Sequence, residues 1–323
     1  MTQKPAGGPA PDQRPQVWLS LPPQEIDGLP DAFDYHYWDG AGDYPADPAD
    51  ARFYVLPYMK GPAVSTRPLA EMTGLRVAQA LSAGVDDLLP HLAKAPAGAV
   101  LCNARGLHDA STAELAVTLI LASLRGIPRF VRGQDSERWY SGFYPALADR
   151  RVLIVGYGSI GAAVEDRLVP FECEVLRVAR SARQTERGPV HPMSELPRLL
   201  PTADVVVLAT PLTEQTRGLA GAEFLAAMKD GALLVNIARG PVLDTKALLA
   251  EAESGRLTAA LDVTDPEPLP AGHPLWHAPG VLISPHVGGS TSAFRPRAER
   301  LIRSQLERFA AGEELVNVVA TSG

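Results

Sequence analysis

The chain has 323 residues, 46% of them hydrophobic, which is enough for the cores of two domains of ordinary size. The net charge of −7 comes from interspersed charges of both signs, and no run of 18 apolar residues occurs. We therefore expect neither a nucleic acid nor a membrane as a partner.

Residues 1–15 are rich in Pro, Gly and polar side chains, which predicts a disordered tail, with the fold beginning near Gln16. They lack the apolar stretch of a secretory signal. The two cysteines, Cys102 and Cys173, lie in apolar segments, far apart and without the spacing of a metal or redox site. These features predict a cytoplasmic protein with free core thiols.

Short aliphatic runs alternate with helix-length segments along the chain. Before residue 105 the runs are PQVWLSL, ARFYVLPY, LRVAQAL and AVLCNA. After residue 150 they are VLIVGYG, EVLRVAR, DVVVLAT, ALLVNIA, AALDV and GVLISPH. Such alternation is typical of α/β proteins with doubly wound parallel sheets, and the two groups of runs predict two sheets.

Two helices define the expected domain boundaries. The pattern Ser111-x-x-Glu114 resembles a capping box and predicts the start of an apolar helix that Gly126 and Pro128 end. Residues 292–311 predict a single amphipathic helix that returns to the first sheet. The expected domains are therefore residues 16–103 with 290–323, and residues 104–289.

The run VLIV leads directly into Gly156-x-Gly158-x-x-Gly161, which an amphipathic segment follows. The first glycine permits a tight turn, the second lets the backbone approach a pyrophosphate, and the third lets helix pack against strand. The N–H groups and the dipole at the helix N-terminus favour the phosphates. The strand and helix context predicts a dinucleotide-binding loop rather than a chance glycine-rich turn.

Three polar residues come just after successive predicted strands: Arg239, Glu267 and His286. Ligands in open α/β sheets bind at that edge. Arginine offers a planar charged fork for a carboxylate, histidine exchanges a proton near neutral pH, and a carboxylate can orient the imidazole. Each residue alone also fits a structural role, as a surface arginine, a solvated loop carboxylate or a turn histidine.

The ordered segments GYGSIG, ADVVVLATPLTEQTRGL, NIARGPVLD, ALDVTDPEP and SPHVGG resemble the D-isomer-specific 2-hydroxyacid dehydrogenase family over roughly residues 50–318. The resemblance implies a Rossmann NAD(P)-binding domain inserted in a flavodoxin-like substrate domain. It implies that Arg239 binds a 2-oxo acid and that Glu267 pairs with His286, which protonates the carbonyl oxygen during hydride transfer.

The resemblance also implies binding residues for the two ligands. Main-chain N–H groups of Ala83 and Gly84 would bind the substrate carboxylate. Consecutive N–H groups point at one anion only where the backbone adopts unusual dihedral angles, which glycine permits. Asp262 would hold the nicotinamide carboxamide, or else cap a strand end. The remaining implied cofactor contacts are Thr112, Tyr157, Ser159, Ile160, Thr210, Pro211, Thr216, Ile237, Ala238, His286 and Gly288, beside the three loop glycines.

Cofactor preference depends on the end of the second strand after the glycine loop. Folds that bind NAD place an acidic residue there to hold the ribose 2′-OH, whereas this chain has Ala179. Arg180, Ser181 and Arg183 follow, which favours a 2′-phosphate over a 2′-OH, unless this segment is only a solvated turn. The sequence therefore predicts NADP(H) ahead of NAD(H).

These features predict a metal-free reductase of small 2-oxo acids, with glyoxylate or hydroxypyruvate as substrate and a D-2-hydroxy acid as product. Two alternatives share the scaffold: a formate or phosphite dehydrogenase, and a corepressor that senses the cofactor. The resemblance and the apolar helix after Glu114 predict a symmetric homodimer.

Overall fold

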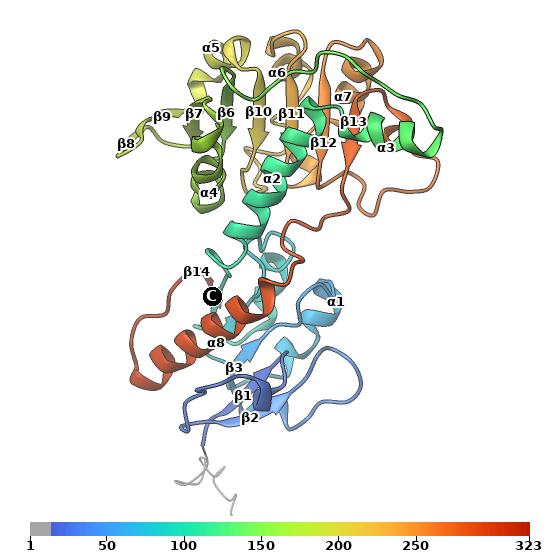
Figure 1. The fold of residues 1–323 in the computed structure, drawn as a ribbon. Coiled ribbons are helices and arrows are strands. Elements are labelled where there is room, and N and C mark those ends of the chain that lie inside the picture. The colour runs from blue at the N-terminus through green and yellow to red at the C-terminus, as the bar shows by residue number, and fades with distance from the viewer. Residues whose placement is uncertain (1–13) are drawn as a thin grey trace, which may run out of the picture. The chain divides into compact units, whose positions relative to one another are not determined.

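The computed structural model describes residues 14–323 and divides into two compact units. The first unit consists of the described residues up to Leu107 together with Arg295–Gly323, and the second is His108–Phe294 (Figure 1). The predicted disordered tail lies outside the described residues, apart from its last two positions. The first unit is thus assembled from both ends of the described chain.

A six-stranded sheet forms the centre of the first unit. Its strands are β1 (Gln16–Leu19), β2 (Asp34–Tyr37), β3 (Ala51–Val55), β4 (Val77–Gln79), β5 (Val100–Cys102) and β14 (Val318–Thr321). The order is β14-β5-β4-β3-β1-β2, and only β14 runs antiparallel to its neighbour. Without β14 the order is 2-1-3-4-5, which is the flavodoxin-like arrangement.

Both faces of this sheet are covered, but mostly by short helices. On one face, Phe309 of α8 (Phe294–Ala311) stacks on Phe33 with ring centroids 5.8 Å apart and meets Phe53 at 5.5 Å. The other face holds a core that includes Trp18 and Tyr54. The connections contain only α1 (Pro62–Ser65) and 3-10 turns, where the sequence predicted longer helices. A proline stands at the first or second position of each, where it fixes the start, because a helix cannot continue toward its N-terminal side through proline.

An eight-stranded sheet forms the centre of the second unit. Its strands are β6 (Arg151–Val155), β7 (Glu174–Ala179), β8 (Arg183–Thr185), β9 (Gly188–Pro192), β10 (Val205–Leu208), β11 (Leu233–Asn236), β12 (Thr258–Leu261) and β13 (Val281–Ile283). The order is β13-β12-β11-β10-β6-β7-β9-β8, parallel except for the β8–β9 hairpin. Counted from β6, the parallel strands follow the Rossmann order 3-2-1-4-5-6, with one strand added.

Alternate residues of these strands enter two separate cores, as expected for a sheet covered on both faces. Leu153 and Leu234 lie in one core, while Ile154 and Val235 lie in the other. The second core is covered by α2 (Asp109–Leu124) and α4 (Ser159–Leu168). The first is covered by α5 (Leu196–Leu199), α6 (Ala222–Ala227) and α7 (Thr245–Glu253). The predicted α/β fold with two doubly wound sheets is confirmed.

The start of α2 differs from the prediction. The helix begins at Asp109, and no side chain caps its N-terminus. Ser111 lies inside the first turn, where its hydroxyl hydrogen-bonds with the Thr291 hydroxyl at 2.8 Å. The capping-box interpretation is therefore wrong, because a tertiary contact engages the serine that the pattern assigned to the cap.

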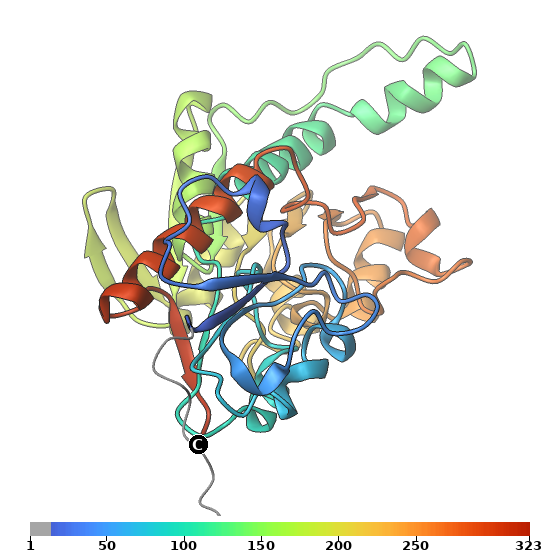
Figure 2. The same cartoon turned by 90° about the horizontal axis from the view of Figure 1, so that it is seen from below.

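A bent helical arm follows α2. Gly126 adopts a left-handed backbone with φ of 70°, and α3 (Ile127–Asp135) begins directly after it. Figure 2 shows α3 and the segment after it standing away from the rest of the second unit. No single helix among residues 14–323 is long and apolar enough to cross a membrane; only α2 and α3 together, bent by 66°, reach that length and composition.

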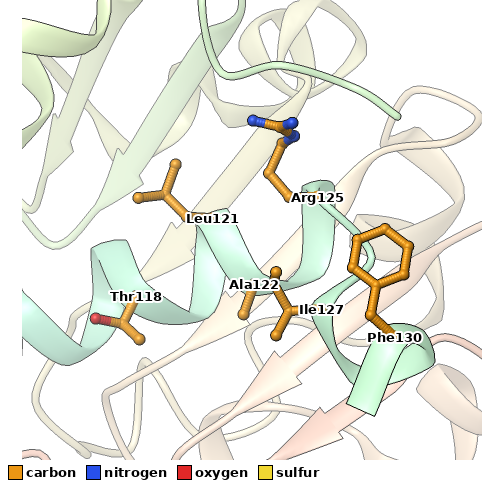
Figure 3. Close-up of a pocket in the computed structure, with 6 residues that line it drawn as sticks. All are labelled: Thr118, Leu121, Ala122, Arg125, Ile127 and Phe130. Atoms are coloured by element: carbon orange, nitrogen blue, oxygen red, sulfur yellow. The ribbon is translucent and has the colours of Figure 1, made fainter. Parts of the chain in front are cut away.

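A pocket lies where α2 meets α3. Figure 3 shows its lining, which is apolar apart from one hydroxyl and one guanidinium: Thr118, Leu121, Ala122, Arg125, Ile127 and Phe130. Ile127 and Val131 expose 45% and 54% of their surface beside it. The arm therefore presents an apolar surface within the described part of the chain.

Candidate active site

The glycine loop lies between β6 and α4, where the strand order of the second sheet reverses. Gly156 has a φ of 107°, and a Cβ there would lie 2.5 Å from the Ala209 carbonyl carbon. A Cβ on Gly161 would lie 2.6 Å from the Gly156 oxygen. These two contacts show why the turn and the helix–strand packing need glycine.

Gly158 differs from the other two loop glycines. A Cβ on Gly158 would meet no atom within 4 Å, so the space in front of the loop is open. Close to this end of the sheet, the buried Thr210 hydroxyl after β10 has no hydrogen-bond partner among the described residues. An open cradle at a helix N-terminus and an unpartnered buried hydroxyl fit a bound dinucleotide.

Three adjacent strands bring the predicted catalytic residues to the same edge. Arg239 follows β11, Glu267 follows β12 and His286 follows β13, and these strands are neighbours in the sheet. Because parallel strands end at one edge, residues far apart in sequence become neighbours there.

His286 and Glu267 form a direct pair. The imidazole Nδ1 lies 2.5 Å from the Glu267 carboxylate oxygen Oε1, and both side chains are partly exposed. The hydrogen bond to Glu267 raises the pKa of His286 above its ordinary value, and the charge of Glu267 adds to that effect, although burial opposes it. For Glu267, burial acts to raise the pKa, but the hydrogen bond and charge of His286 outweigh it and lower the pKa. The pair therefore favours an imidazolium beside a carboxylate, with Nε2 left to donate a proton.

Arg239 lies beside this pair. Its charge lowers the pKa values of both His286 and Glu267, and one guanidinium nitrogen donates to the Ala238 carbonyl at 2.9 Å. Gly240 lets the main chain after β11 pack closely against the loop after β12, because a Cβ on Gly240 would lie 1.9 Å from the Thr264 carbonyl oxygen. The absence of a side chain at Gly240 therefore fixes how close Arg239 lies to the loop that carries Glu267.

Asp262 holds the loop that carries His286. Its buried carboxylate accepts hydrogen bonds from the Ser284 hydroxyl at 2.7 Å and from the N–H groups of Val287 at 2.9 Å and Gly288 at 3.0 Å. His286 has a φ of 52°, and its own N–H donates to the Asp262 carbonyl at 2.8 Å. The sequence predicts either a carboxamide contact or a strand-end cap for Asp262, and these hydrogen bonds show that it holds the end of a strand; the left-handed backbone of His286 was not predicted.

The predicted cofactor-selecting segment is exposed. β7 ends at Ala179, and Arg180 and Ser181 follow in solvent-facing positions. Arg183 donates from its guanidinium to the Tyr157 carbonyl of the glycine loop. No ion pair occupies Arg180 or Arg183 in the described part of the chain.

The structure adds a buried network beneath the loop that sequence reasoning missed. The Tyr157 hydroxyl donates to Glu165 of α4, and Glu165 also pairs with Arg177 of β7. Arg177 donates from Nε at 2.8 Å. The charge of Arg177 is thus neutralised by Glu165, whereas the exposed Arg180 and Arg183 have no such carboxylate partner among residues 14–323. A charged residue inside the apolar stretch of α4 was the available signal.

The remaining predicted cofactor residues lie in the second unit, and the predicted substrate turn lies in the first. The Thr216 hydroxyl donates to the Pro211 carbonyl at 2.6 Å and closes its own loop. Ile237 and Ala238 are buried after β11. The predicted substrate turn with Ala83 and Gly84 belongs to the first unit, between β4 and β5.

Comparisons with known proteins agree with this architecture. Residues 117–288 match the family model described as D-isomer specific 2-hydroxyacid dehydrogenase, NAD binding domain. The glyoxylate reductase/hydroxypyruvate reductase of Mus musculus is 34% identical over 252 residues, covering 75% of this chain and 76% of that protein. The mitochondrial formate dehydrogenase of Hordeum vulgare is 33% identical over 243 residues, covering 72% and 64%.

A solved structure extends the similarity over nearly the whole chain. The D-isomer specific 2-hydroxyacid dehydrogenase from Xanthobacter autotrophicus Py2, in complex with NADPH and MES, is 29% identical with a TM-score of 0.78. The match covers 95% of this chain and 98% of that one. With the glycine loop, the strand orders and the matched family model together, the chain belongs to the D-isomer specific 2-hydroxyacid dehydrogenase family of NAD(P)-dependent oxidoreductases.

Proposed function

We propose that this chain reduces a small 2-oxo acid, glyoxylate or hydroxypyruvate, to the corresponding 2-hydroxy acid, of D configuration where it is chiral. The observation that carries the proposal is the 2.5 Å contact between His286 and Glu267, together with the raised pKa of His286. Reduction of a carbonyl places negative charge on oxygen, and an imidazolium held by a carboxylate is suited to protonate it.

Each residue of the site has a distinct role in this reaction. The glycine loop would hold the dinucleotide, which would supply a hydride for the carbonyl carbon. Arg239 binds the substrate and polarises its carbonyl, and His286 gives the Nε2 proton to the oxygen. Glu267 stabilises the imidazolium before that transfer. The N–H groups of Ala83 and Gly84 bind the substrate carboxylate, and Asp262 is assigned to the nicotinamide carboxamide.

The formate dehydrogenase relative raises an alternative donor. Oxidation of formate anion to CO₂ releases a hydride but removes no proton from oxygen, so it needs no general acid or base. The His286–Glu267 pair therefore favours the 2-oxo acid. A cofactor-sensing role without turnover would likewise give this pair no task.

Steady-state turnover assays test the proposal. Glyoxylate, hydroxypyruvate, formate and phosphite are each supplied with both phosphorylated and unphosphorylated cofactor in the redox state that the reaction needs. The highest kcat/KM is expected for glyoxylate or hydroxypyruvate. Turnover of formate or phosphite alone would contradict the proposal, and turnover of none of the four would favour the sensing role.

We also propose that NADPH is the preferred reductant. The end of β7 carries no carboxylate, and Arg180 and Arg183 offer guanidinium groups for a 2′-phosphate. Charge-assisted contacts predict a preference in kcat/KM of about 5- to 150-fold, or 1 to 3 kcal/mol. The Arg180→Ala/Arg183→Ala variant should lose most of this preference, whereas Arg198→Ala, an exposed arginine of α5, should keep it. A wild-type preference for NADH would contradict the assignment.

The Glu267→Gln variant tests the pairing through pH. His286 must be charged for reduction, and Glu267 raises its pKa above the ordinary value of about 6.5. Removal of the negative charge should lower that pKa, so the alkaline limb of the kcat/KM profile moves to lower pH. The profile for glyoxylate reduction is measured from about pH 5 to 9 in both proteins, a range that brackets the ordinary histidine pKa. An unshifted limb would remove the pairing from the mechanism.

We propose a symmetric homodimer formed through the second unit. In the segment after α3, Trp139 exposes 94% of its surface and Phe143 is fully exposed, and Ile127 and Val131 of α3 expose 45% and 54%. Large exposed apolar side chains gathered in one segment of the chain are typical of protein interfaces, and a second copy presents the same segment.

Light scattering at micromolar concentration should give twice the chain mass of 34.4 kDa. The Trp139→Asp/Phe143→Asp variant should shift toward the monomer. Val169→Asp, which changes an equally apolar exposed residue of the same unit, serves as the control and should remain dimeric. A wild-type mass equal to one chain would refute the dimer.

A further inference from the structure

Two glutamine side chains are completely buried in the first unit. Gln79 ends β4, and Gln305 lies on the buried face of α8 next to Leu306; both are 0% exposed. A buried amide destabilises the fold unless its donors and acceptors find partners. The partners of these two amides therefore show what the pair holds in place.

Gln79 connects the ends of two neighbouring strands. Its Nε2 donates to the Ala80 carbonyl at 2.8 Å and to the Asn103 carbonyl at 3.1 Å, just beyond β4 and β5. Its Oε1 accepts a hydrogen bond from Gln305 Nε2 at 2.7 Å. The C-terminal helix is thus tied directly to the edge at which these strands end.

Gln305 completes the network toward the end of the chain. Its Nε2 also donates to the Val316 carbonyl at 2.9 Å, and its Oε1 accepts from the Val316 N–H at 3.0 Å. Every polar atom of both amides therefore has a partner. A fully satisfied buried network is rigid, because no member can move without leaving a buried group unpaired.

The network continues through Asn103 to the turn after β4. Asn103 Nδ2 donates to the Ala83 carbonyl at 2.8 Å, and the Ala104 N–H donates to the Ser82 carbonyl at 2.8 Å. Within residues 14–323, the N–H groups of Ala83 and Gly84 donate to no protein atom. The turn is therefore fixed through its carbonyl groups while two of its donors stay available.

We propose that Gln79, Gln305 and Asn103 are positioning residues for the substrate carboxylate. They hold the turn that carries the Ala83 and Gly84 N–H groups, through the carbonyl groups of Ser82 and Ala83. This inference rests on the proposed function, which assigns the carboxylate to this turn. It adds that Gln305 in the C-terminal helix acts on substrate binding through Gln79, without touching the substrate.

Gln79→Met tests the proposal with little change in side-chain volume. Small displacements of a binding group cost up to about 10²-fold in rate. We expect KM for glyoxylate to rise at least about 10-fold with kcat nearly unchanged, because the carboxylate contact is made in ground and transition states alike. The dissociation constant of NADPH should stay the same, since the glycine loop belongs to the other unit.

Ser322→Ala is the matched control. The buried Ser322 hydroxyl donates to the Leu92 and Ala95 carbonyls at 3.2 and 3.0 Å in the same unit, without contact to the turn. This variant should lower Tm and leave KM unchanged. If Gln79→Met lowers Tm equally and also leaves KM unchanged, the network only stabilises the fold and the proposal is overturned.

Gln79→Glu gives a readout that a purely structural role would not produce. The carboxyl group of the new glutamate can still accept the hydrogen bond from Gln305. Only its protonated form can donate to the Ala80 or Asn103 carbonyl oxygen, as the amide of Gln79 does. Burial raises the pKa of a carboxyl group, so the acid form persists to higher pH than usual. The ratio of KM between variant and wild type should therefore rise with pH; a ratio independent of pH would contradict the proposal.

Asn103→Ala keeps the test decisive if the glutamine variants fail to fold, because Asn103 is only partly buried. It should raise KM as Gln79→Met does. The proposal has two parts: the network holds the turn, and the held turn binds the substrate. Hydrogen exchange of the Ala104 amide, measured in the full chain without substrate, tests the first part alone. Faster exchange in Asn103→Ala than in Ser322→Ala supports the hold on the turn, even if glyoxylate and hydroxypyruvate prove not to be substrates. Equal exchange with unchanged KM overturns it.

Discussion

The His286→Gln variant should lose most of the catalytic rate while it keeps its cofactor. A positioned general acid contributes about 10²- to 10⁴-fold, and we expect kcat for glyoxylate reduction to fall by that factor. Glutamine can still hydrogen-bond to Glu267 across the 2.5 Å contact, but it carries no exchangeable proton acidic enough for the developing alkoxide. Stopped-flow or steady-state assays at saturating NADPH measure the loss.

The dissociation constant of NADPH provides the control for this variant. The main chain around His286 is held by the Asp262 carboxylate through Val287 and Gly288, so the substitution should leave the loop in place. Fluorescence titration should return a value close to that of the wild type. A fully active variant would falsify the proton-transfer role of His286.

Gly240→Ala should reduce both stability and activity although it touches no substrate. A Cβ at this position would lie 1.9 Å from the Thr264 oxygen and 2.2 Å from its carbonyl carbon, so two main-chain segments must separate. Overpacking of this kind costs about 1 to 3 kcal/mol. Because Arg239 precedes the glycine, a displacement near 1 Å predicts a loss of about 10²-fold in kcat/KM.

Gly221→Ala is the control for this prediction, since its Cβ would lie 3.2 Å from the nearest atom, the Gly218 oxygen. It needs a shift of only a few tenths of an ångström. Thermal unfolding and kcat/KM are measured for both variants. Equal effects of the two substitutions would show that the close approach at Gly240 does not position Arg239.

The buried strands of both sheets were predictable because each is a short run of aliphatic residues. Four strands were not: β2, β8, β9 and β14. They lie at or next to sheet edges. No apolar run marks β2, β8 or β9, and β14 has only the short exposed run Val318–Ala320. Their pairing depends on neighbours distant in sequence, which a local pattern does not contain.

The catalytic edge was predictable for a different reason. Arg239, Glu267 and His286 each follow a strand, and sheet topology makes the ends of successive parallel strands neighbours. The close contact between His286 and Glu267 could not be obtained from their spacing, because it depends on the loop that Asp262 holds. Likewise, Gln79 was visible only as a polar residue in an apolar run and Gln305 only as one polar residue of an amphipathic helix, and nothing in the sequence pairs them.

The division of the chain has a consequence for folding during synthesis. The second unit is one continuous segment, so all of its strands are available before α8 leaves the ribosome. The first unit begins earlier but lacks the amide of Gln305 and β14 until residues 305–321 are made. Because domains fold as units during synthesis, the unit whose first strands are made earlier should be completed later, with β5 exposed as an unpaired edge until then.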